Sequence, residues 1–120
     1  MIHKELNIWK QSRSLVLHIY ELTYTLPKSE YFGLIAQMRK SVISIPSNIA
    51  QGAGRSSTQE YIRFLDIATG SLSELETQLI IAIRLGYTEK NEVIENEIRG
   101  LNKMFRNLKK VLKAKIKKQT

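Results

Sequence analysis

The fold is decided by residues 57–86, which read STQEYIRFLDIATGSLSELETQLIIAIRLG. Apolar side chains recur in this stretch every three or four residues, the period of an amphipathic helix. They are Tyr61, Phe64, Leu65, Ala68, Leu72, Leu75, Leu79, Ala82 and Ile83. Ser57 and Glu60 form a capping box before this stripe, and Gly86 supplies a left-handed stop after it. We therefore predict one long helix over residues 58–85.

The same period predicts three more helices, over residues 8–26, 30–50 and 89–117. Pro27 should end the first of them, Ser29 should cap the second, and Thr88 should begin the last. Pro46 lies inside the second helix and should kink it near Val42, unless the helix restarts there.

Short connections between helices of similar length favour antiparallel neighbours. No segment of the sequence shows the period-two alternation of a strand. The predicted fold class is therefore all-α, an antiparallel up-and-down four-helix bundle. At 120 residues the chain has the length of one domain, so we assign residues 1–120 to a single bundle.

The composition limits the cellular compartments in which we expect the protein and the kinds of chemical site that it can form. The chain contains no cysteine, which removes disulfides and thiolate metal ligands and is typical of a reducing compartment. Its N-terminus carries charges where a signal peptide would be apolar, and the longest apolar run, residues 79–83, is far too short to span a bilayer. We expect a cytoplasmic protein that does not enter membranes.

A catalytic or metal site is not apparent. His3 and His18 are the only histidines and lack the spacing of a ligand pair. The glycine-rich loop at residues 52–57 lacks the ending of a phosphate-binding loop, so we interpret it as a helix stop followed by a cap. Arg39 and Glu76 both fall near apolar stripes, which suggests a buried or interfacial ion pair between them. We expect no enzyme activity, no cofactor and no metal.

Charge is distributed very unevenly along the chain. Residues 1–98 hold ten Lys and Arg against eleven Asp and Glu, a net charge of −1. Residues 99–120 hold nine Lys and Arg and no acid, a net charge of +9. A field of one sign concentrated in one segment attracts polyanions.

Six of these cations recur at spacings of four and three residues, so they share one side of the last helix. This basic stripe consists of Arg99, Lys103, Arg106, Lys110, Lys113 and Lys117. The apolar residues of the same helix lie nearly opposite, at Ile94, Ile98, Leu101, Phe105, Leu108, Leu112 and Ile116. The stripe predicts binding to a nucleic-acid backbone, RNA or DNA. The alternative is a solvated face that only confers solubility.

The second helix is apolar on two sides. Beside its core stripe it carries Phe32, Ala36, Ile43 and Ala50. A helix that is apolar on two sides is usually buried on both. These four residues therefore indicate either an oligomer interface or a core face that is broader than usual.

Many short motifs of the chain resemble one known family. They are Trp9-Lys10, Tyr31-Phe-Gly-Leu34, Gln37-Met-Arg39, Ser44-Ile-Pro-Ser-Asn-Ile-Ala50, Gly52-Ala-Gly-Arg55, Phe64-Leu65, Gly70-Ser-Leu72, Glu74-Leu-Glu76 and Leu85-Gly-Tyr87. The chain resembles the four-helix-bundle proteins encoded within 23S ribosomal RNA intervening sequences. Gln51 departs from the family pattern, which usually has glutamate there, so no role of an acid can be carried over to it.

The resemblance implies a left-handed four-helix bundle. It also implies kinship with the accessory proteins of diversity-generating retroelements, which resemble this fold. Those proteins form ring-like pentamers and bind nucleic acid alongside a reverse transcriptase. By this analogy we expect a homo-oligomer, with five subunits favoured, and a protein partner such as a reverse transcriptase. The family has no settled molecular role, so its name supplies no function.

Two functions from different classes follow from the sequence. The first is a non-enzymatic oligomeric bundle that binds nucleic acid through the basic stripe. The second is a protein–protein interaction or assembly module that uses its apolar second face, with the lysines serving solubility.

Overall fold

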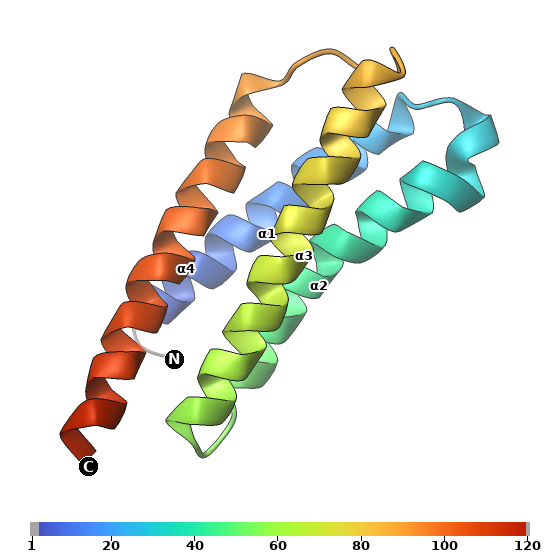
Figure 1. The fold of residues 1–120 in the computed structure, drawn as a ribbon. Helices are drawn as coiled ribbons and strands as arrows, with labels where there is room; N and C mark the ends of the chain where they lie inside the picture. The colour runs from blue at the N-terminus through green and yellow to red at the C-terminus, as the bar shows by residue number, and fades with distance from the viewer. Residues whose placement is uncertain (1–2, 120) are drawn as a thin grey trace.

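The computed structural model describes residues 3–119, which form four long α-helices in one antiparallel bundle (Figure 1). The helices are α1 (His3–Tyr24), α2 (Ala36–Ala53), α3 (Thr58–Arg84) and α4 (Glu92–Gln119). Two short turns, η1 (Lys28–Glu30) and η2 (Tyr31–Ile35), connect α1 to α2. This architecture confirms the predicted all-α, up-and-down fold class.

Each helix packs against its neighbours in the sequence, and α4 returns to α1 to close the bundle. The contact between α2 and α3 is the most extensive, whereas α4 packs less closely against α1 and α3. The bundle is a rod of 53 × 25 × 20 Å. Because α3 and α4 are antiparallel, the lysine-rich end of α4 lies beside the beginning of α3 (Figure 1).

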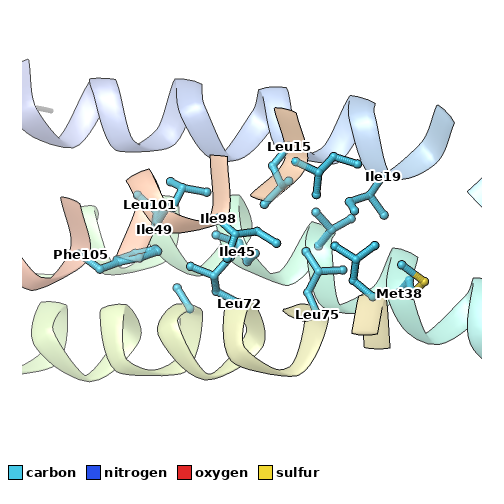
Figure 2. Packing of buried hydrophobic residues seen from close by; sticks show 14 of the residues in the cluster. Leu15, Ile19, Met38, Ile45, Ile49, Leu72, Leu75, Ile98, Leu101 and Phe105 are labelled. Carbon is cyan, nitrogen blue, oxygen red and sulfur yellow. The ribbon is translucent and has the colours of Figure 1, made fainter. Parts of the chain in front are cut away.

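The core is formed by the apolar stripes that the sequence predicts. Figure 2 shows side chains from all four helices meeting along the axis of the rod, among them Leu15, Ile45, Leu72 and Phe105. Each of these four is completely buried. Burial of this kind stabilises the fold by about 25 cal/mol for each Å² of apolar surface removed from water.

The helix ends differ from the predicted bounds by several residues. α1 begins at His3 instead of residue 8 and ends at Tyr24 instead of residue 26, although Leu26 is still buried. α4 begins at Glu92, because the side chain of Asn91, not Thr88, accepts the backbone N–H of Ile94 at 3.0 Å. The prediction of Thr88 as the first residue was therefore wrong.

The prediction for the start of the second helix was also wrong. Ser29 lies inside η1, and the cap is Glu30, whose carboxylate accepts the backbone N–H of Leu34 at 3.1 Å. Gly33 is the non-helical residue of η2, and a Cβ there would lie 2.6 Å from Glu30 Oε1. The helix neither stops nor restarts at Pro46, since α2 continues across it.

The capping predictions at the two ends of α3 agree with the structure. Ser57 Oγ accepts the backbone N–H of Glu60 at 3.0 Å, and Gly86 has the positive φ of 77° that a left-handed stop requires. The glycine-rich loop agrees with its interpretation as a helix stop followed by a cap, because α2 ends at Ala53 with Gly54 at its C-cap, and Ser57 caps α3. Gly52 lies inside α2 and is buried, so the loop is shorter than predicted.

Candidate functional site

All six cations of the basic stripe are exposed, and all lie on α4, which continues as a helix to Gln119. The stripe does not point straight away from the bundle. Four of its members, Arg106, Lys110, Lys113 and Lys117, line an open groove on the side of α4 that faces α3. The packing of α4 therefore turns most of the stripe toward its neighbour.

This groove, called the basic groove below, has a volume of about 690 Å³. Its lining residues are Thr69 from α3 and Asn102, Phe105, Arg106, Lys109, Lys110, Lys113, Ala114 and Lys117 from α4. Five of these nine side chains are cationic. Phe105 is completely buried, so it forms the floor and presents no open ring face. The groove can attract an anionic chain but cannot stack a base on an aromatic ring.

Lys109 is a member of the basic groove that the sequence interpretation missed. Its ammonium group donates to Asp66 Oδ1 at 3.1 Å and to Thr69 Oγ1 at 3.4 Å, so it bridges α4 to α3. Its side chain is only 19% exposed. The residue was missed for two reasons. Lys109 lies between the apolar and basic stripes on the helical wheel, so it belongs to neither. In addition, the register of α3 against α4 cannot be determined from the sequence of either helix alone.

A second, more polar pocket of about 500 Å³ continues the groove toward the beginning of α4. It shares Asn102 and Arg106 with the basic groove and adds Glu76, Glu95 and Arg99 to the lining. Glu95 forms an ion pair with Lys90, with 3.8 Å between Oε2 and Nζ. The charged lining residues are therefore of both signs toward the beginning of α4. From Asn102 toward the end of α4, the charged lining residues are all cationic.

The second apolar face lies elsewhere on the bundle. Phe32, Ala36, Ile43 and Ala50 are all exposed, with Phe32 at 90% and Ile43 at 43%. Phe32 belongs to η2 and not to α2, so the four residues do not share one regular helix as predicted. Their exposure excludes the interpretation as a broad core face of a single bundle. We call these four residues the apolar face.

The predicted ion pair between Arg39 and Glu76 is absent. Arg39 faces α1, where its Nε donates to Thr23 Oγ1 at 2.9 Å and its guanidinium lies over the rings of Tyr20 and Tyr24. Glu76 is exposed in the pocket between α3 and α4. The prediction failed because both residues border an apolar stripe, but on sides of the bundle that face different neighbours.

A serine, a histidine and a glutamate come together between α1 and α4. Ser14 donates to Glu97 Oε2 at 2.7 Å, and His18 Nδ1 bonds to Glu97 Oε1. Both partners therefore use the carboxylate, and the serine is not placed to pass a proton to the histidine. Among the described residues no group of three or more His, Asp and Glu side chains is arranged to hold a metal ion. The cluster acts as a tie between two helices.

Comparison with known proteins identifies the relatives of this fold. Residues 4–112 match the family described as 23S rRNA-intervening sequence protein. The chain belongs to this family. No curated protein matches the chain. No helix within residues 3–119 is long and apolar enough to cross a membrane.

One solved relative is a protein of unknown function from the S23 ribosomal protein family of Bacteroides thetaiotaomicron VPI-5482. It is 26% identical to this chain, and the match covers 89% of this chain and 98% of the relative, with a TM-score of 0.81. The relative therefore shares the whole fold, and its own function is unknown.

Several of the motifs through which the chain resembles the intervening-sequence family form contacts between elements of the bundle. Ser44 and Ser71 share a hydrogen bond of 2.8 Å between α2 and α3. Tyr87 donates to Glu30 Oε2 at 3.0 Å, which ties the loop after α3 to the turns before α2. Arg55 lies over the ring of Phe64 at 4.7 Å. These contacts join elements of the bundle and therefore contribute to the shared fold.

Proposed function

We propose that this intervening-sequence family protein is a non-enzymatic helical bundle that binds the backbone of RNA or DNA through the basic stripe of α4. The observation that carries the proposal is the exposure of all six cations along one side of an ordered helix. A disordered tail would pay an entropy cost on binding that an ordered helix does not.

The surroundings of the stripe also support a polyanionic ligand. Residues 99–120 contain no acid, so the attraction is not cancelled within the segment. One acid of α3, Asp66, accepts a hydrogen bond from Lys109, which is outside the stripe. Contacts of this kind bind phosphates and carry no sequence information, so binding should depend weakly on base sequence.

The test is reversal of charge at Lys103, Arg106, Lys110 and Lys113 to glutamate. We expect the variant to lose binding to a generic RNA and a generic duplex DNA, measured by fluorescence anisotropy over a range of salt concentrations. For the wild type, log K should fall linearly with log salt, by about 0.7 to 0.9 for each phosphate contact. Circular dichroism should show the same helix content in both proteins.

A matched pair of variants tells whether binding depends on the position of the cations or only on the net charge of the protein. The double variant Arg106→Glu, Lys110→Glu changes two stripe residues. The double variant Lys115→Glu, Lys118→Glu changes the net charge equally on the same helix, at exposed positions outside the stripe. Only the first should lose binding. Equal affinity of the wild type and the four-site variant at physiological salt would reject the proposal.

We further propose that the protein forms a homo-oligomer through its apolar face, with five subunits favoured by analogy with the retroelement accessory proteins. The support is the exposure of Phe32 and Ile43 on a monomer surface, where apolar groups of this size cost free energy in contact with water. A ring would bring several segments of charge +9 together and strengthen the attraction for a polyanion.

The competing function is a protein–protein interaction module whose basic side confers only solubility. The same exposed apolar face supports it, with another protein, such as a reverse transcriptase, covering Phe32 and Ile43. It predicts a monomer that binds no nucleic acid. Under either function we place the protein in the cytoplasm, because a chain without cysteine is typical of a reducing compartment.

A further inference from the structure

The basic groove lies between two packed helices, and α3 contributes Thr69 to its lining. Axes of packed helices are typically about 8–10 Å apart, whereas a B-DNA duplex is wider than its major groove, which alone measures about 12 Å. We therefore expect a duplex to touch the outer side of α4 without entering the space between Thr69 and Lys113. An extended single strand is narrow enough to enter it.

The cations of the groove follow its length. Arg106, Lys110 and Lys113 line it at steps of four and three residues, which correspond to about 6 Å and 4.5 Å along the helix axis. Lys109 holds the opposite wall in place through Asp66 and Thr69. A chain with regularly spaced negative charges can therefore meet successive cations while it lies parallel to α4.

The ends and the floor of the groove define the orientation and the mode of recognition. The continuation beyond Asn102 has mixed charge, because Glu76 and Glu95 line it together with Lys90 and Arg99. A bound strand should therefore be held most strongly in the half from Asn102 toward the end of α4, where the charged lining residues are all cationic. Because Phe105 is buried, the floor offers no ring for a base, while Asn102 adds a neutral hydrogen-bonding group to the lining.

From these observations we infer that the ligand of the basic groove is an unpaired nucleic-acid strand that lies lengthwise between α3 and α4, with its phosphates along α4. This inference rests on the proposed function and makes it more specific, since a stripe on the outside of a helix would bind duplex and single strand alike. The bases face away from the protein, so the groove does not select a sequence.

The first experiment needs no variant. Anisotropy titrations of the wild type with oligouridylate, oligodeoxyuridylate and a duplex DNA of the same length compare the three ligands directly. Both single strands should bind about ten-fold more tightly than the duplex. The comparison of oligouridylate with oligodeoxyuridylate tells whether the ribose hydroxyl contributes. A duplex that binds as tightly as the single strands would overturn the inference.

The second experiment fills the groove without changing its charge. Thr69→Trp adds a large side chain to the wall of the groove. Thr77→Trp is the matched control, because Thr77 is exposed on the same helix outside the groove lining, and both threonines donate to the carbonyl oxygen four residues earlier. Thr69→Trp should weaken binding of oligouridylate about ten-fold, and Thr77→Trp should bind like the wild type.

The outcomes distinguish this inference from the proposed function. If Thr69→Trp binds like Thr77→Trp while the four-site charge reversal still abolishes binding, the strand lies outside the groove. The stripe then binds nucleic acid, but the inference is wrong. If the charge-reversed protein also binds normally, both fail. Thermal unfolding of each tryptophan variant shows that a loss of binding does not come from a loss of fold.

Discussion

Gly52 of α2 lies in close contact with α3. A Cβ built on it would lie 2.8 Å from Phe64 Cβ and 2.8 Å from Tyr61 Cδ1, too close for ordinary contact. Gly70, in the interior of α3, has nothing within 4 Å of the same position and is exposed. Two glycines within helices therefore have opposite environments, and the sequence does not distinguish them.

This contrast predicts opposite effects of alanine at the two sites. Gly52→Ala should destabilise the protein by about 1–3 kcal/mol, because overpacking outweighs the gain in helix propensity. Gly70→Ala should stabilise it by about 0.5–1 kcal/mol, because alanine loses less backbone entropy in a helix. Urea unfolding at one protein concentration measures both, and shifts of the same sign would contradict the packing described for α2 and α3.

Tyr61 makes stability depend on pH in the alkaline range. Burial raises the pKa of its phenol well above the ordinary value of 10.0, and the nearby carboxylate of Glu5 adds to the shift. Below pH 10 the folded and unfolded chains both keep the proton, so the contribution to stability is complete. Above it the unfolded chain loses the proton first, and rising pH favours unfolding.

We therefore expect the wild type to lose stability above pH 10 more steeply than Tyr61→Phe, by about 1.4 kcal/mol for each pH unit. Other tyrosines and lysines titrate in both proteins and cancel in the comparison. Urea unfolding followed by circular dichroism at pH 9, 10 and 11 gives the two slopes. Parallel pH profiles would show that Tyr61 ionises as easily in the folded protein as in the unfolded chain.

At the scale of the helices, the core face of each helix could be predicted well, because it follows from a periodic pattern of apolar residues. The stripes that name Leu72, Leu75 and Leu101 as core residues follow from the 3.6-residue period alone, and all three are buried. The boundaries were harder, because capping depends on which of several polar residues reaches a free N–H. Asn91 and Glu30 supply these caps, and both are close in sequence to the residues expected to do so.

The candidate site was predictable only in part, for a related reason. The spacing of cations on α4 gives the stripe, since neighbours on one helix are fixed by its geometry. The groove depends in addition on how α4 is rotated against α3, which brings Thr69 and Lys109 together. The prediction of an ion pair between Arg39 and Glu76 failed for the same reason. Contacts between helices need the rotation of each helix, and one sequence does not supply it.

At the scale of the whole molecule, the apolar face predicts association. Ile43→Asp places a charge within that face and should shift the protein to a monomer of 13.8 kDa, whereas the wild type should have about five times this mass. Ile81→Asp is the control, because Ile81 on α3 is equally exposed, at 44% against 43% for Ile43. Light scattering after size exclusion gives the masses, and a monomeric wild type would contradict the expectation.

The polarity of α4 has a consequence for how the protein approaches a ligand. Glu92, Glu95 and Glu97 occupy its beginning, and only cations follow from Arg99 onward. Along a rod 53 Å long, this separation of charge creates an electric dipole moment with its positive pole at the end where α4 finishes. In the field of a polyanion such a dipole experiences a torque, so the rod turns its cationic end forward before contact. At 0.15 M ionic strength the field decays within about 8 Å, so this turning should hasten encounters mainly in dilute salt.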